Sequence, residues 1–183
     1  MSVKDIIILA CEFTENQSLG QALENNSVLD EEQSEICDSL VKCFNLVNNE
    51  VASEYVPIVK WQRVSTTNFK VEYSSLSSKV LHIISVRDSL GRKVKFKAYD
   101  SYLMAFANTV DIIYQAEPAE LGIDSEFYST LPNRIYAYGI AREYYFQQTL
   151  FDEADIWEER FKNTLSIMAR KRSETHIPKR RWL

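Results

Sequence analysis

Residues 130–182 read TLPNRIYAYGIAREYYFQQTLFDEADIWEERFKNTLSIMARKRSETHIPKRRW, and this stretch decides the fold. Apolar side chains recur in it every three or four residues in two runs, which predicts helices over residues 131–148 and 152–170, each with one buried stripe. The link at residues 147–151 is too short for anything but the turn of an antiparallel helical hairpin. The two stripes consist of Ile135, Tyr138, Ala141 or Arg142, and Tyr145, and of Ala154, Trp157, Phe161, Leu165 and Met168.

The end of the same stretch carries a block of positive charge. Residues 170–183 hold six basic side chains and one acidic, a formal charge of +5, whereas residues 1–169 hold 15 basic and 25 acidic, a charge of −10. A cationic end on an acidic body is typical of a segment that docks on an acidic surface, and a solvated end without a partner fits the composition equally well. Trp and Arg are enriched at the centres of interfaces. The candidate docking residues are Arg170, Lys171, Arg172, Lys179, Arg180, Arg181 and Trp182.

The first 57 residues are also predicted to be mainly helical. Residues 3–13 fit a short helix, with a buried strand as the alternative because three consecutive isoleucines suit either period. Residues 14–30 are rich in Asn, Gln, Ser and Glu, which favours a mostly irregular surface connection. Asp30 is the expected N-cap of a long helix that ends before Pro57. Its apolar stripe is Ile36, Leu40, Phe44, Val47, Val51 and Tyr55.

Between these helical parts, residues 58–116 have the alternation that is typical of short strands. One strand is expected at residues 69–73. A hairpin is expected from residues 80–86 and 92–98, with Val94, Phe96 and Ala98 facing a core and the intervening lysines facing solvent. Residues 102–106 and 109–116 predict a second hairpin, whose first arm also fits a helical turn.

The chain of 183 residues is therefore expected to have an α+β fold. Residues 1–57 and 130–170 would form one helical bundle, and residues 58–117 an inserted antiparallel β domain, either a small sheet or a sandwich. Residues 171–183 would form a basic tail. A hydrophobic fraction of 45% and a charged fraction of 26% are those of an ordinary folded protein.

The sequence carries no pattern of a known catalytic or metal site. Cys37 and Cys43 are turned about 240° from each other around a helix and cannot easily share one ion. His82 lies in an apolar strand and is expected to be a packed neutral residue, not a catalytic base. The acids at residues 152–159 suit a helix start and a solvated face. We expect no enzyme, cofactor or metal, and three cysteines without a secretory signal indicate free thiols in a reducing compartment.

Five basic side chains around Gly91 are candidates for contact with nucleic acid or with other copies in a ring. Lysines on one face of the predicted hairpin could follow a phosphate backbone. Against this stands the acidic balance of the whole chain, and outward lysines also protect the edge of a sheet from aggregation. The candidates are Arg87, Arg92, Lys93, Lys95 and Lys97.

Several runs of this sequence resemble the neck proteins of tailed bacteriophages, which are described as head–tail connector, adaptor or tail-tubular proteins. The resemblance covers most of the chain in the order helices, β insert, helices. The runs that carry it are SEYVP at residues 53–57, IYAYGIAREY at 135–144, DEA at 152–154 with Trp157 and Phe161, and PKRRW at 178–182.

The resemblance implies a structural protein without catalysis. Such proteins form a ring, typically a dodecamer, between the portal vertex of the capsid and the tail. The C-terminal segment commonly reaches the portal or a neighbouring subunit, and the β insert commonly faces the tail or the outside of the ring. The lumen would be passed by genomic DNA, with transient and unspecific contacts.

The sequence thus predicts a virion protein of the phage neck, made in the host cytoplasm, that joins portal and capsid to the tail. Its partners would be the portal protein, the tail or a second neck ring, and other copies of itself, and no membrane. The alternative is a small cytosolic nucleic-acid-binding or regulatory module that uses the hairpin at residues 87–97.

Overall fold

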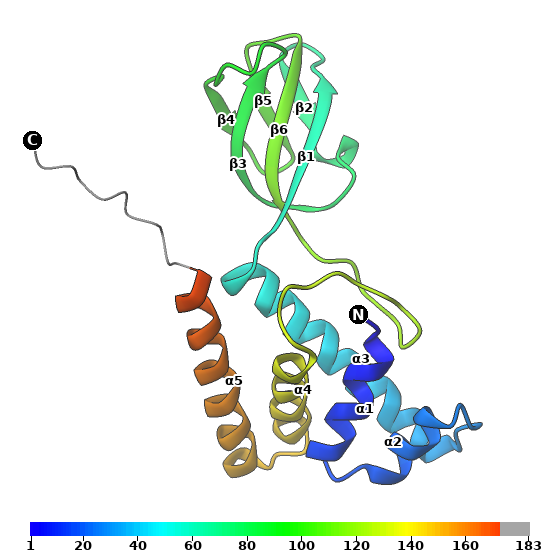
Figure 1. Ribbon diagram of the computed structural model, residues 1–183. Helices are drawn as coiled ribbons and strands as arrows, with labels where there is room; N and C mark the ends of the chain where they lie inside the picture. Colours follow the sequence, from blue (N-terminus) through cyan, green and yellow to red (C-terminus); the bar gives the residue numbers. More distant parts are fainter. Residues whose placement is uncertain (173–183) are drawn as a thin grey trace, which may run out of the picture. The chain divides into compact units, whose positions relative to one another are not determined.

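The structure, a computed structural model, describes the backbone of residues 1–172 and the side chains of residues 1–168. The chain forms two compact units, which we call the helical unit (Met1–Asn48 and the chain from Glu120 onward) and the β unit (Asn49–Ala119) (Figure 1). The predicted α+β class is confirmed. The helices are α1 (Val3–Phe13), α2 (Gln17–Glu24), α3 (Glu31–Glu50), α4 (Asn133–Gln147) and α5 (Phe151–Arg172). The strands are β1 (Ile58–Ser65), β2 (Lys70–Glu72), β3 (Val80–Asp88), β4 (Phe96–Ala98), β5 (Tyr102–Ala105) and β6 (Thr109–Ala116).

The first two helices pack against each other at a glycine. Helix α1 forms over the predicted residues, so the alternative of a buried strand is wrong. The prediction of irregular chain over residues 14–30 is also wrong, because α2 forms there and buries Leu19 and Leu23. A Cβ atom at Gly20 would stand 3.2 Å from the Cβ atom of Cys11, so the missing side chain lets α2 approach α1 closely.

Helix α3 begins and ends where the sequence indicates. The Asp30 carboxylate accepts a hydrogen bond from the Gln33 amide (2.8 Å), and the Gln33 side chain accepts one from the Asp30 amide (3.3 Å). This reciprocal pair is a capping box and confirms Asp30 as the cap. After Glu50 the helix widens into a π-helical turn, Val51–Tyr55, and stops before Pro57.

Helix α4 is enclosed by other helices on several sides. Its residues 135–141 are all buried, so the prediction of a single stripe is wrong for this helix. Helices α1 and α5 both pack against it. Gly139 lies directly over α3 and α5, since a Cβ atom there would stand 2.6 Å from Cγ1 of Val47 and 3.2 Å from Cε2 of Phe161. Glycine is therefore required for this close approach.

Helix α5 matches its predicted stripe and completes the antiparallel hairpin (Figure 1). Ala154, Phe161 and Leu165 are buried, and the other two members of the stripe are half-buried. The chain turns at Thr149, which has a positive φ of 61°. Across the hairpin, the Arg142 guanidinium donates a hydrogen bond of 2.7 Å to the Glu158 carboxylate.

The β unit consists of two antiparallel sheets of three strands each. The strand orders are β1-β6-β3 and β2-β5-β4. In the first sheet β6 pairs with β1 over its whole length, with Ile58 opposite Ala116 and Ser65 opposite Thr109. Buried side chains from both sheets form one core, which has Leu103, Tyr114 and Ile112 among its fully buried members.

The sequence located β2, β3, β5, β6 and the residues of β4, but it assigned no separate strand to β1, and both predicted hairpins need correction. The chain after Gly91 pairs with β3 only next to the turn, where the Val94 amide donates to the Val86 carbonyl (3.0 Å), and β4 then pairs with β5. The segment at 102–106 is a strand and not a helical turn, but β5 and β6 belong to different sheets. Within residues 1–172 no helix is both long and apolar enough to cross a membrane.

Candidate functional site

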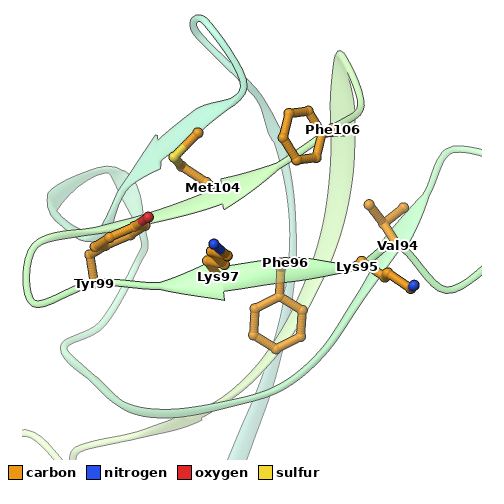
Figure 2. Close-up of a pocket in the computed structure, with 7 residues that line it drawn as sticks. All are labelled: Val94, Lys95, Phe96, Lys97, Tyr99, Met104 and Phe106. Carbon is orange, nitrogen blue, oxygen red and sulfur yellow. The ribbon is translucent and has the colours of Figure 1, made fainter.

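The largest hollow among those described in the β unit lies on strands β4 and β5. It has a volume of about 630 Å³ and is lined mainly by apolar side chains. Figure 2 shows Met104 on β5 and Phe106 just after it projecting to the same side, whereas the Phe96 ring projects from β4 in the other direction. We call this hollow the groove. Its lining residues are Val94, Lys95, Phe96, Lys97, Tyr99, Met104 and Phe106.

The pairing of β4 with β5 explains how these residues come together. Lys97 is directly opposite Met104, so both side chains lie on the same face of the sheet. At one end Tyr99 stacks on Tyr102 with ring centroids 4.6 Å apart, which fixes its ring. Phe106 remains 73% exposed. The groove is thus a largely apolar surface with ordered walls that the rest of the β unit does not cover.

Strand β4 is an edge strand of three residues, and this position contradicts the predicted burial. Phe96 and Ala98 were expected to face a core, but all three residues of β4 are exposed. They occupy the inner face of the sheet opposite Ala105 and Leu103, at a margin that no further strand covers in the described part of the chain. An open edge next to an apolar hollow is a surface that can accept a partner.

The five basic candidates of the 87–97 region have different surroundings. Lys95 and Lys97 line the groove. Arg92 bonds the Asp88 carboxylate at 2.7 Å, so its charge is compensated. Arg87 and Lys93 are exposed and form an isolated bridge by their backbones. Among the residues that the structure describes, the three lysines have no carboxylate partner.

The second surface of interest lies at the end of the α4–α5 hairpin and was not found from the sequence. Phe146 and Phe151 contact each other with ring centroids 5.4 Å apart, and they are 60% and 54% exposed. Leu150, the chain neighbour of Phe151, is 46% exposed. The carboxylates of Asp152, Glu153 and Asp155 are exposed next to this cluster, and none has an ion pair within residues 1–168. We call these six residues the hairpin end.

A signal for this surface was present in the sequence. Leu150 and Phe151 are consecutive large apolar residues in a helix–helix link, where polar residues are usual. The five acids at residues 152–159 suggested only a solvated face, although several of them lie next to exposed apolar side chains.

The outer face of the β1-β6-β3 sheet carries an ion pair of a half-exposed arginine and a largely buried aspartate, beside an exposed tryptophan. The Arg63 guanidinium donates two hydrogen bonds to the Asp111 carboxylate, of 2.7 and 2.8 Å, and lies over the Trp61 ring. The hydrogen bonds from Arg63 hold the pKa of Asp111 below its ordinary value. Trp61 is 61% exposed. This pair ties β1 to β6 and is a structural feature of the β unit.

Nucleophilic and metal-binding groups do not form a site in the described part of the chain. Burial raises the pKa of Cys11 and of Cys43 to about 12 and also raises that of Cys37. Within the same residues no three His, Cys, Asp or Glu side chains lie close enough to hold a metal ion. The expectation that His82 packs inside is wrong, because a β-bulge next to it leaves this side chain exposed.

The predicted docking residues of the basic tail fall mostly outside the described part. Lys179, Arg180, Arg181 and Trp182 lie outside the described residues. The backbone of residues 170–172 forms the last turn of α5, but the side chains of Arg170, Lys171 and Arg172 are not among those described. The docking prediction for this segment therefore stays a prediction.

Comparison with known proteins gives no family. No family model matches this chain. A search of curated proteins gives no match either.

Proposed function

We propose that this chain is a structural protein of a tailed-phage neck, made in the host cytoplasm and assembled as a ring between the portal vertex and the tail. The proposal rests on the resemblance of the sequence to such neck proteins and on the order of its elements, with helices before and after a β unit. The ring would leave a passage for DNA, and its contacts with DNA would be transient and unspecific.

The observation that carries an assembly role is the exposed apolar cluster at the hairpin end. Three large apolar side chains, at residues 146, 150 and 151, are each about half exposed. Contiguous apolar patches on a soluble protein mark interaction sites. Covering the exposed half of each side chain would contribute on the order of 1 kcal/mol, so the cluster can add several kcal/mol to a contact between proteins.

The basic tail supplies the proposed contact with the portal. Lys179, Arg180 and Arg181 would pair with carboxylates of the portal or of a neighbouring subunit, and Trp182 would anchor the segment. Residues 173–183 follow the last described helix, so removing them shortens none of the described helices. We therefore expect the shortened protein to fold, with unchanged circular dichroism, and to lose its attachment to portal-containing particles.

The test is reconstitution with particles that contain the portal but lack the neck. We expect electron microscopy to show a ring of density at the portal vertex, and light scattering to show a mass near twelve subunits for isolated rings. Absence of density at the vertex over a wide range of protein concentration would refute the neck function. The shortened protein serves as the matched control in the same assay.

A second candidate function, binding of nucleic acid, is favoured by one observation. Lys95 and Lys97 line a groove that also exposes aromatic rings at Tyr99 and Phe106, and stacking platforms for single strands combine these groups. Filter binding to oligo-dT across a salt series tests this candidate. Micromolar affinity with steep salt dependence, lost in Lys95→Glu/Lys97→Glu, would support it.

A further inference from the structure

We propose that the groove of one copy receives the hairpin end of a second copy, with the Phe146, Leu150 and Phe151 side chains in the hollow. The inference rests on the proposed ring, because it names the contact that would repeat between neighbouring subunits. Both surfaces are exposed among the described residues, and in this proposal each covers the other between two copies.

The charges of the two surfaces are complementary. Lys95 and Lys97 stand at the groove without carboxylate partners among the described residues. Asp152 and Glu153 stand at the hairpin end, also without partners in that part of the chain. Residues 58–116, which contain the groove, hold nine basic and four acidic side chains, a formal charge of +5 on a chain of charge −5. Contact between the surfaces would therefore pair charges of opposite sign around an apolar centre.

The sizes of the two surfaces also agree. A hollow of about 630 Å³ is in the range that accepts a group of several large side chains. The two phenylalanine rings at the hairpin end contact each other edge to face, so they present one preformed apolar projection. A preformed projection and a groove with ordered walls lose little conformational freedom on contact.

A contact of this kind has the symmetry that a ring needs. The groove and the hairpin end are different surfaces of one chain, so each copy offers one to each neighbour. Such a head-to-tail contact repeats from copy to copy and closes into a ring when the rotation allows it. The basic tail is a poorer occupant of the groove, because Lys179 to Arg181 would repel Lys95 and Lys97.

The experiment is cross-linking between two variants of the full chain. Phe106→Cys places a thiol at the groove, and Leu150→Cys places one at the hairpin end. The native thiols are buried, so they compete little. Equal amounts of the two variants are mixed and oxidised with diamide, and dimers that contain one copy of each are measured by mass. In the control mixture Ser89→Cys, an exposed position at the β3 turn, replaces Phe106→Cys. We expect at least tenfold more mixed dimer with Phe106→Cys than with Ser89→Cys.

Charge reversal gives the second arm. Lys95→Glu/Lys97→Glu in the Phe106→Cys copy should reduce the yield of mixed dimer severalfold. Asp152→Lys/Glu153→Lys in the Leu150→Cys copy should restore it. Equal yields in the two mixtures, or no effect of either reversal, overturn the proposal. Binding of oligo-dT that depends on Lys95 and Lys97, without excess cross-linking, overturns it in favour of a nucleic-acid surface.

The result separates this contact from the neck function. Rings that form on portal-containing particles while cross-linking stays at the control level would leave the neck function standing and sink the proposed contact. Strong cross-linking without attachment to such particles would support the contact between copies and reject the neck function.

Discussion

Replacing Gly139 by alanine should destabilise the helical unit, although alanine is the better helix former. An added Cβ atom would stand 2.6 and 2.8 Å from the two Cγ atoms of Val47 and 3.2 Å from Phe161. Ordinary carbon contacts are about 3.5–4.0 Å, so Val47 or the whole of α3 must move by about 1 Å. Val47 is fully buried and its branched side chain has little rotamer freedom, so it cannot turn away.

The magnitude follows from two opposing effects. Alanine gains about 1 kcal/mol over glycine in the interior of a helix. Overpacking a close contact costs about 1–3 kcal/mol, and a distance below 3 Å to a rigid side chain places this case near the upper value. We therefore expect Gly139→Ala to lower the free energy of unfolding by about 1–2 kcal/mol.

Urea denaturation followed by circular dichroism at 222 nm measures this loss. Gly122→Ala is the matched control, because the nearest atom to its new Cβ would be the Ser125 Oγ at 4.0 Å, and its effect should stay within about 0.5 kcal/mol. In a Val47→Ala background the added methyl group has room, so Gly139→Ala should there be neutral or stabilising. A Gly139→Ala protein as stable as the wild type, or a loss that Val47→Ala does not relieve, would refute the close-approach argument.

Three further predictions concern groups whose environment the structure defines. Hydrogen bonds from Arg63 lower the pKa of Asp111 in the folded state, so the stability they give is present above the unfolded value of about 3.9 and is lost as the pH falls through the lower folded value. Asp111→Asn should therefore lower the melting temperature at pH 7 and lose less between pH 7 and pH 3 than the wild type, and an identical acid sensitivity would contradict this. Cys11 and Cys43, with pKa values of about 12, should react with Ellman's reagent at pH 8 roughly a thousandfold more slowly in the folded protein than in urea, and rapid labelling of the native protein would show the burial to be wrong. Tyr145→Phe removes a hydroxyl that donates 3.0 Å to a carbonyl of α1, so thermal denaturation should show a loss of about 1 kcal/mol, or 2–4 °C, and an unchanged midpoint would exclude this bond as a stabilising contact.

The helices show which part of a fold a periodic pattern can predict. Helices α3 and α5 have one buried face, so their spacing indicated most of the buried residues and, with Asp30 and Pro57, the ends of α3. The α3 stripe was incomplete, because Cys37 and Cys43 are buried while Ile36 is only half-buried. Helix α4 is buried on several sides because other helices surround it. A pattern with one apolar stripe does not indicate burial of this kind. Helix α2 was missed because only Leu19 and Leu23 interrupt a polar segment, and its position depends on the close contact at Gly20.

In the β unit the sequence predicted most of the strands, though not β1, and it did not predict their partners. Alternation assigns side chains to faces, whereas pairing depends on where the chain crosses between sheets, here between β5 and β6. The groove was missed for the same reason. Lys95 and Lys97 were recognised as outward-facing, but only the position of β4 at an edge beside Met104 and Phe106 makes them the rim of a hollow.

The β1–β6 pairing has a consequence for how such a chain can change through evolution. Ile58 lies opposite Ala116, so the chain enters and leaves the strands of the β unit at hydrogen-bonded neighbours about 5 Å apart. The insertion therefore holds its own two ends close together, as a short loop would, and the helical unit requires no more of it. Residues 58–116 could be exchanged for another small domain with adjacent ends, or shortened to a tight turn, at little cost in loop-closure entropy. Recombination at these two points would replace the two sheets and the groove and leave the packing of the helices as it is.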